Sequence, residues 1–415
     1  MGAPRKGSAN RQELGEHLTE LALLADTAGA EVVGELTQQL DRPNAGTYLG
    51  TGKVEELADL VKDTRASLVI FDDELTPSQG KNVEDAVGTR VVDRAELILD
   101  IFASRARSNE AKMQVELAQL EYMLPRLTRM WTHLERYAGG MIGARGPGET
   151  QLETDRRLVN HRIKLLKERL EEVQRSREVQ RASRAGHFKA SLVGYTNAGK
   201  SSILRGLSGT EVHVENRLFA TLDPLTREID LGDVGTVLVT DTVGFIRKLP
   251  HHLVASFRAT LEEVKEADLL LHVVDASQPA WEDQRQVVEQ VLHELGATEA
   301  PRLLVVNKTD LLPEEELHAL QERLQRLAPN NVFVSAVAEH GLEPLARALA
   351  AAVRARKPLT EINISVSDGK LLSEIHQYGE VIDQRTLGDR LILRAHLPEK
   401  LAGRLKQAGA RLRVE

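Results

Sequence analysis

A glycine-rich segment in the middle of the sequence has the residue types and spacing that bind phosphate. Gly194 to Ser201 match the pattern Gly-x-x-x-x-Gly-Lys-Ser, directly after an apolar run and before a helical one. Glycines let backbone N–H groups turn towards phosphate oxygens, and Lys200 would reach the β and γ phosphates. The hydroxyl of Ser201 would bind Mg²⁺. We therefore expect a nucleotide site that includes Gly194, Tyr195, Thr196, Asn197, Ala198, Gly199, Lys200, Ser201 and Ser202.

A second motif, Asn307 to Asp310, selects the base. It follows the apolar run Leu303 to Val306. The carboxylate of Asp310 can accept from both N1–H and the exocyclic amine of guanine, whereas adenine would leave it unpaired. This favours GTP and GDP over ATP, although the motif alone could be a polar turn after a strand. We expect the base to contact Asn307, Lys308, Thr309 and Asp310, and the backbone of Ser335, Ala336 and Val337.

Two further segments fit the order of a GTPase. Asp241 to Gly244 follow an apolar run, so Asp241 would hold Mg²⁺ directly or through water and the Gly244 N–H would sense the γ phosphate. Upstream, the hydroxyl of Thr221 would complete the magnesium shell. Lys200, Thr221 and Gly244 are the expected catalytic residues, and Ser201, Thr221 and Asp241 the expected Mg²⁺ ligands. The nucleotide-contacting residues here would be Phe219, Ala220, Thr221, Leu222, Asp223, Asp241, Thr242, Val243 and Gly244.

The elements around these motifs indicate a mostly parallel sheet with helices on both faces. Apolar runs at residues 190–193, 237–240, 269–274, 303–306 and 332–334 suit strands that are buried on both faces. The N-terminal residues 12–103 alternate helical and strand patterns, with a strand expected at Glu31 to Leu36, and indicate a small α/β domain. After residue 357 the order strand, helix, strand, strand, helix, strand is typical of a ferredoxin-like domain.

Between these parts, residues 104–189 form a basic helical segment. Apolar residues fall at spacings of three and four on both sides of a glycine-rich loop, which predicts an antiparallel helical hairpin with a break near Pro125. Eighteen Lys or Arg face 11 Asp or Glu here, a balance of +7, whereas the whole chain carries −8. We thus expect four domains: residues 12–103, 104–189, 190–357 and 358–415.

Composition excludes several classes of protein. With no cysteine there is no disulfide framework or thiolate metal site, and no apolar stretch approaches the ~20 residues that cross a bilayer. We expect a cytoplasmic monomer without a membrane partner. The adjacent His251 and His252 suit solvated loops. Gly50 to Lys53 lack the spacing of a phosphate loop and are interpreted as a helix start, with a second nucleotide site as the alternative.

Taken together, the sequence resembles the HflX family of translation-factor-related, ribosome-associated GTPases over residues 47–342. The resemblance is strongest in Gly146 to Arg157, outside the GTPase motifs, and includes Phe219 to Pro224 and Asp241 to Arg247. It implies binding to the large ribosomal subunit, with the hairpin loop reaching rRNA, and splitting or rescue of stalled ribosomes. The rRNA contacts expected from it are Gly140, Gly143, Arg145, Gly146, Arg156 and Arg157.

Two residues modify the expected mechanism. Phe245 occupies the position where Ras-type enzymes have a Gln that orients water, so hydrolysis should be slow until a partner completes the site. Asn197 resembles the asparagine with which potassium-dependent GTPases hold K⁺ beside the phosphates, and a hydrogen bond that shapes the loop is the alternative. The competing function is a GTP-gated RNA-binding module that assists ribosome assembly without splitting; a membrane transport regulator is disfavoured.

Overall fold

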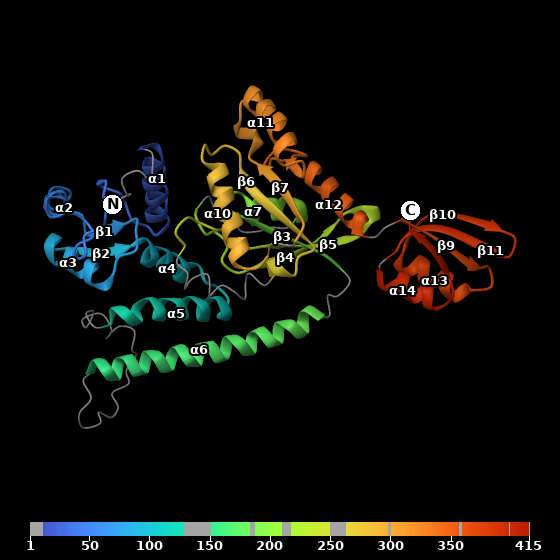
Figure 1. Ribbon diagram of the computed structural model, residues 1–415, viewed down its shortest axis with the longest axis horizontal. Helices are drawn as coiled ribbons and strands as arrows, with labels where there is room; N and C mark the ends of the chain where they lie inside the picture. Colours follow the sequence, from blue (N-terminus) through green and yellow to red (C-terminus); the bar gives the residue numbers. More distant parts are fainter. Residues whose placement is uncertain are drawn as a thin grey trace.

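The computed structural model describes residues 11–127, 151–182, 187–209, 217–249, 263–297, 300–356, 359–397 and 399–414. The N-terminal helices and strands lie at one end of the molecule, a six-stranded sheet lies in the middle, and a C-terminal sheet lies at the other end (Figure 1). No helix in these ranges combines the length and the apolar composition needed to span a membrane.

The N-terminal α/β part is built on one parallel strand pair. Strand β1 pairs with β2 so that Leu68 lies opposite Arg90. Helix α3 begins with a capping box between Thr76 and Gln79 and ends at Gly88, whose φ of 71° suits glycine. Its elements are α1 (Arg11–Thr27), α2 (Thr51–Thr64), β1 (Leu68–Phe71), α3 (Pro77–Val87), β2 (Arg90–Asp93) and α4 (Arg94–Arg105).

Two sequence expectations for this part have clear outcomes. The strand expected at Glu31 to Leu36 is wrong, because these residues form no strand with any described residue. The helix start expected at Gly50 to Lys53 is confirmed, since Gly50 is the N-cap of α2. The Lys53 ammonium pairs with Glu56 at 2.9 Å within the same helix.

The basic segment contributes two helices that pack side by side. They are α5 (Asn109–Met123) and α6 (Gln151–Ala182), and the short 3₁₀ turn η1 (Leu124–Arg126) ends α5. The expected break at Pro125 is therefore confirmed. Leu117, Ile163 and Leu166 meet in the buried seam between the helices. The Arg162 guanidinium also donates to both carboxylate oxygens of Glu116, at 2.7 and 2.9 Å.

The central sheet has the strand order β4-β5-β3-β6-β7-β8. All neighbouring strands run parallel except β4, which is antiparallel to β5. Its strands are β3 (Phe188–Gly194), β4 (Leu225–Asp230), β5 (Thr236–Asp241), β6 (Leu269–Asp275), β7 (Arg302–Asn307) and β8 (Asn331–Phe333). Its helices are α7 (Lys200–Ser208), α10 (Trp281–Glu294), α11 (Glu314–Leu327) and α12 (Glu343–Arg356), with the turns η3 (Gly232–Val234) and η4 (Thr309–Leu311).

Both faces of this sheet are buried, which positions the loops at its carboxyl edge. Leu192 packs with Ile203 of α7 and Leu345 of α12, whereas its neighbour Val193 packs with Val288 of α10 on the other face. Because β3, β5 and β7 are parallel, the residues that follow them gather at one edge. The expected sheet with helices on both faces is confirmed.

The C-terminal part has the expected ferredoxin-like order. Its antiparallel sheet runs β10-β11-β9-β12, and two helices supply the core residues Ile375 and Leu405. The elements are β9 (Leu359–Ser365), α13 (Gly369–Tyr378), β10 (Glu380–Leu387), β11 (Arg390–His396), α14 (Glu399–Gln407) and β12 (Arg411–Val414).

Candidate nucleotide site

The phosphate loop connects β3 to α7. A side chain at Gly194 would place its Cβ 2.2 Å from the Val273 carbonyl oxygen, which no rotamer avoids. Gly199 has φ 95°, and a Cβ there would meet the Asn307 amide nitrogen at 2.2 Å. Both positions therefore require glycine. The loop closes tightly enough that its backbone N–H groups can surround an anion at the start of α7.

Lys200 is buried at the first position of α7. Its ammonium donates to the carbonyl oxygens of Gly194 and Tyr195, at 3.1 and 2.8 Å. Burial lowers the pKa of Lys200 to about 8, and the nearby Asp241 carboxylate opposes that shift. The amine is therefore mainly protonated at neutral pH. A bound phosphate would replace the two carbonyl oxygens as the acceptor of its hydrogen bonds.

Three oxygen-bearing side chains converge beside the loop. The Ser201 hydroxyl lies 2.7 Å from the Thr221 hydroxyl and donates to Asp241 Oδ2 at 2.6 Å. The second oxygen of Asp241 is buried and has no hydrogen-bond partner among the described residues. Burial raises the pKa of Asp241, and the Lys200 charge opposes this. Two hydroxyls and a carboxylate with an unsatisfied oxygen match the hard donor set of Mg²⁺.

The two expected switch segments contact the phosphate loop. The Phe219 N–H donates to the Thr196 hydroxyl at 2.8 Å, and Thr196 N–H donates to the Phe245 carbonyl at 2.7 Å. A Cβ on Gly244 would lie 2.6 Å from Thr196 Cα, so only glycine allows this approach. A cavity of about 150 Å³ is lined by Thr196, Asn197, Gly199, Lys200, Ser201, Ser202, Arg217, Phe219, Ala220, Thr221, Thr242, Gly244 and Lys308.

The expected base-binding residues are joined by side-chain hydrogen bonds. The Asn307 amide donates to the Ala198 carbonyl at 2.9 Å, and its oxygen accepts from Ala336 N–H at 3.2 Å. The Ser335 hydroxyl donates to Asp310 at 2.6 Å, which orients that carboxylate. Thr309 donates to the Val334 carbonyl at 3.0 Å, whereas Val337 is exposed. The loops after β7 and β8 are thus tied to the phosphate loop.

Several expected contact residues face the N-terminal part or the basic segment instead of the cavity. Leu222 and Val243 are buried in a cluster with Phe102 of α4. Asp223 accepts from the N–H groups of Arg107 and Ser108, both at 3.2 Å, directly before α5 begins. The backbone of these residues runs along the nucleotide site, whereas their side chains contact other parts of the chain.

Sequence reasoning missed three participants, which are Arg217, Asp275 and Glu20. Arg217 lines the cavity, and Asp275 pairs with the Lys308 ammonium at 2.7 Å. The Tyr195 hydroxyl accepts from Arg247 N–H at 2.9 Å and donates to Glu20 of α1. Arg217 lies just before the expected segment Phe219 to Asp223, and Asp275 directly follows the apolar run 269–274, so each carries only a weak signal. Glu20 lies 175 residues from Tyr195 along the sequence, and no local pattern indicates their contact.

The expected rRNA contacts are only partly visible. Gly140, Gly143, Arg145 and Gly146 lie outside the described residues. Arg156 and Arg157 are on α6, where both are exposed. Their guanidinium groups are therefore available to solvent on the basic helical segment.

Comparison with known proteins gives consistent matches along most of the chain. Three family models match: "GTP-binding GTPase N-terminal" over residues 15–103, "GTP-binding GTPase Middle Region" over residues 105–184, and "50S ribosome-binding GTPase" over residues 189–308. The chain is 52% identical over 336 residues to the GTPase HflX of Caldanaerobacter subterraneus subsp. tengcongensis, covering 80% of this chain and 76% of that protein.

Two other matches show the range of similarity. The GTPase HflX of Escherichia coli is 46% identical over 364 residues, or 87% of this chain and 85% of the relative. A GTP-binding protein from the archaeon Sulfolobus solfataricus, solved in complex with GDP, is 25% identical, with a TM-score of 0.44, and the alignment covers 85% of this chain and 98% of that one.

Proposed function

The chain belongs to the HflX family of GTPases and hydrolyses GTP, and we propose that it does so on the large ribosomal subunit to split or rescue stalled ribosomes. The observation that carries this proposal is the match of residues 189–308 to a family described as 50S ribosome-binding GTPases. The attached segment 104–189, with its balance of +7, supports an RNA partner, because Lys and Arg neutralise phosphates.

In this proposal Ser201, Thr221 and Asp241 hold Mg²⁺. The buried Asp241 oxygen has no hydrogen-bond partner within the described ranges, which supports this assignment, since burying it without a compensating cation costs desolvation free energy. Bound there, Mg²⁺ would supply positive charge that offsets the negative charge developing on the phosphates. Lys200 would hold the same phosphates, and Gly244 would offer its N–H to the γ phosphate. Asp310 and the Asn307 loop would select guanine.

Hydrolysis by the isolated chain should be slow. The Phe245 ring is almost fully buried, packed in the cluster that contains Phe102 and Phe219, so it cannot hydrogen-bond an attacking water. A partner that supplies the missing group would raise turnover by about 10³ to 10⁵. We propose that the ribosomal subunit is this partner.

Asn197 is a second candidate cation ligand. Its backbone is left-handed, with φ 60°, its side chain is exposed, and it lines the phosphate cavity. An amide oxygen there would suit K⁺, which would add positive charge beside the phosphates. Hydrolysis by the chain with large subunits should then be faster in potassium than in sodium chloride, and Asn197→Ala should remove the difference. Equal rates in the two salts would contradict this role.

Co-sedimentation with purified large subunits tests the proposed partner. In the presence of a non-hydrolysable GTP analogue, the chain should pellet with the subunits. Charge reversal of Arg156 and Arg157 to Glu should weaken binding at least tenfold, because two phosphate contacts become repulsive. Reversal of the exposed Arg326 on α11 is the matched control. If all three proteins bound alike, α6 would not be the contact surface.

Sucrose-gradient profiles then separate the two candidate functions. The same basic helices would suit a GTP-gated module that binds rRNA during assembly without dissociating ribosomes. A splitting factor should convert assembled ribosomes into free subunits with the analogue bound, whereas the assembly module should bind subunits and leave assembled ribosomes intact.

A further inference from the structure

Arg217 brings a positive charge to the phosphate cavity that the roles assigned above leave unused. Three cationic side chains line this cavity: Lys200, Arg217 and Lys308. Lys200 is buried and donates to the phosphate loop, and Lys308 pairs with the Asp275 carboxylate at 2.7 Å. Arg217 is exposed and forms no ion pair with a residue that the structure describes. Within those residues, Arg217 is therefore the lining cation whose charge is available to a bound ligand.

The backbone next to Arg217 is anchored in the protein core. Leu218 and Phe219 are buried in the cluster that also contains Phe102 of α4. Phe219 has a left-handed backbone, with φ 54°, so the chain turns sharply before it reaches Thr221. Arg217 and Thr221 thus precede and follow a fixed turn, and both line the cavity. An anchored backbone keeps the guanidinium near the phosphates, as a group that acts on a reaction requires.

The contacts of this turn place it at the γ-phosphate end of the site. The Phe219 N–H donates to the Thr196 hydroxyl at 2.8 Å. Gly244, whose N–H is the expected γ-phosphate contact, lies against the same threonine, because an added Cβ would be 2.6 Å from Thr196 Cα. The same Cβ would be 3.1 Å from the Lys200 ammonium. Thr196 is therefore a common neighbour of the turn beside Arg217 and of the γ-phosphate contact.

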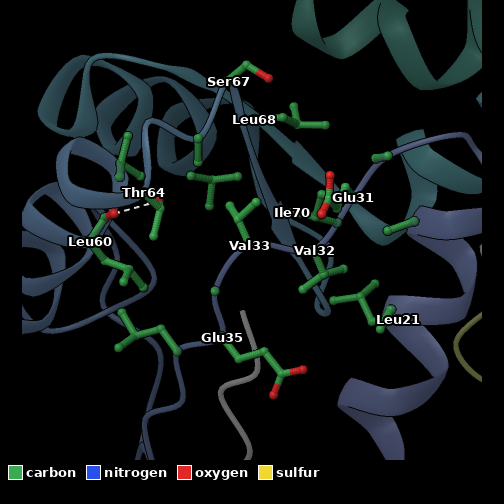
Figure 2. Close-up of a pocket in the computed structure, with 18 of the residues that line it drawn as sticks. Leu21, Glu31, Val32, Val33, Glu35, Leu60, Thr64, Ser67, Leu68 and Ile70 are labelled. Carbon is green, nitrogen blue, oxygen red and sulfur yellow. Dashed lines mark hydrogen bonds between the residues drawn. The ribbon is translucent and has the colours of Figure 1, made fainter.

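A larger cavity in the N-terminal part has a different chemistry. It measures about 510 Å³ beside α1 and α2, and Figure 2 shows aliphatic side chains such as Leu60 and Leu68 around it. The one cation among its lining residues is the exposed Arg65, which shares the lining with the carboxylates of Glu31 and Glu35. A cationic lining therefore distinguishes the phosphate cavity from this one.

We propose that Arg217 is a catalytic residue of GTP hydrolysis, which donates hydrogen bonds to the γ-phosphoryl oxygens as the reaction proceeds. The oxygen of water bonds to the γ phosphorus, and the bond from that phosphorus to the β–γ bridging oxygen breaks. The electron pair of the broken bond stays on GDP, and both protons of water end on inorganic phosphate. A guanidinium stabilises the charge that shifts in this step through its paired N–H donors and remains protonated throughout.

This role differs from the one that Phe245 leaves open. A guanidinium has N–H donors and no acceptor, so Arg217 cannot take a proton from the attacking water. Arg217 supplies charge, whereas orientation of the water still depends on a partner. It should therefore support hydrolysis by the isolated chain as well as hydrolysis in a stimulated complex. The proposal rests on GTP hydrolysis by this family and not on the proposed ribosomal partner.

Single-turnover hydrolysis of radiolabelled GTP by excess full chain, without ribosomes, tests this role. Arg217→Ala should lower the rate by about 10²- to 10³-fold, the loss expected for one donor to a transition state. Arg217→Lys keeps the charge but not the paired donors, so it should recover part of this loss. The affinity for GDP should change by less than about threefold, because a transition-state contact does not stabilise GDP.

A matched variant controls for the loss of surface charge near the site. Arg205→Ala removes an exposed arginine of α7 that does not line the cavity. This variant should hydrolyse GTP and bind GDP like the unmodified chain. Fluorescent-nucleotide titration of every variant confirms that its nucleotide site is folded.

Three results would overturn the proposal. An unchanged single-turnover rate in Arg217→Ala would remove Arg217 from the reaction. A loss of GDP affinity as large as the loss of rate would make it a ground-state contact to the nucleotide. A defect that appears only when large ribosomal subunits are added would make it a contact to that partner. If the subunits never change turnover, the ribosomal proposal fails, and the rates of the isolated variants still decide the role of Arg217.

Discussion

The Phe219 ring packs edge-on against the Phe102 ring, with centroids 4.7 Å apart and planes at 86°. Phe102 belongs to α4 of the N-terminal part, whereas Phe219 begins the segment that carries Thr221. The N–H of Phe219 also donates to Thr196 in the phosphate loop. Any movement of this segment with the bound nucleotide must therefore alter its contact with the N-terminal part.

A double-mutant cycle measures this contact. Phe102→Leu and Phe219→Leu keep an apolar side chain but lose the ring and its edge-to-face geometry, so each alone should destabilise the protein. Their coupling free energy in urea unfolding should be about 0.5 to 1.5 kcal/mol. Tyr48 and Phe71, a T-shaped pair with centroids 6.3 Å apart and outside the site, provide the control cycle. Strict additivity of the first pair would show that the two rings do not communicate.

A buried charge network makes a second connection between the same two parts. The Arg94 guanidinium donates to Asp72 at 2.5 Å and to Glu20, and Glu20 in turn accepts from Tyr195 of the phosphate loop. Burial lowers the pKa of Arg94 to about 10, still far above neutral pH. Lys248 also contacts Asp72. The network is therefore charged and enclosed.

Removing Arg94 should be strongly destabilising. Arg94→Leu leaves two carboxylates without their buried partner and should cost about 3 to 5 kcal/mol in unfolding free energy. Arg90→Leu is the matched control: its side chain is 59% exposed in an ion pair with Glu96, and such pairs contribute about 0 to 1 kcal/mol. The unfolding free energy of both variants is measured in denaturant. Similar losses of unfolding free energy would show that the buried Arg94 contributes no more to stability than the exposed Arg90.

Much of this architecture could be predicted because its signals are local. The strands β3, β5, β6 and β7 contain the largely apolar runs seen in the sequence, and the phosphate and guanine motifs have fixed spacings next to them. Strand β4 was missed, since Leu225–Asp230 is an edge strand with mostly polar, partly exposed side chains and lacks an apolar run. Its antiparallel pairing with β5 depends on the loop between them.

Long-range pairs could not be predicted in the same way. Asp223 and Ser108 lie 115 residues apart, and each is an ordinary polar residue in its own sequence context. Glu31–Leu36 shows the opposite error, because its composition favours a strand, and yet strand formation requires a neighbour to pair with. The composition of a segment indicates which secondary structure it can form, whereas a neighbouring strand decides whether it pairs into a sheet.

The buried His272 predicts an acid-sensitive fold. Burial, together with the charges of Arg285 and Arg302, lowers the pKa of His272 to about 3 from 6.5. Between these values the unfolded chain binds a proton that the folded chain does not, so stability falls as pH falls below 6.5. The slope from this group is about 1.4 kcal/mol per pH unit.

The variant His272→Asn should flatten this dependence. Between pH 6.5 and 5 the parent chain should lose about 2 kcal/mol more unfolding free energy than the variant, measured in urea at each pH. The exposed His318 is the control, and its Asn variant should follow the parent. Parallel curves for the parent and His272→Asn would contradict the lowered pKa.

Base selection should depend on the hydrogen-bonding pattern of Asp310. Asp310→Asn should weaken GDP binding by about 10- to 100-fold, since one guanine donor loses its acceptor. Xanthosine diphosphate should bind the variant better than the parent, because the amide can donate to the added carbonyl. Ser335→Ala removes the hydroxyl that donates to Asp310 and should cost less, about tenfold. Competition with a fluorescent nucleotide measures the affinities for GDP and xanthosine diphosphate. If Asp310→Asn left the affinity for xanthosine diphosphate unchanged, Asp310 would not contact the base.

GTP turnover by the purified chain, with and without large ribosomal subunits, tests the central claim most directly. In potassium buffer with Mg²⁺, the subunits should accelerate turnover by about 10³-fold or more, and Lys200→Ala should abolish the accelerated rate. Turnover that is equally slow with and without subunits, at concentrations where the nucleotide is bound, would contradict a ribosome-triggered GTPase.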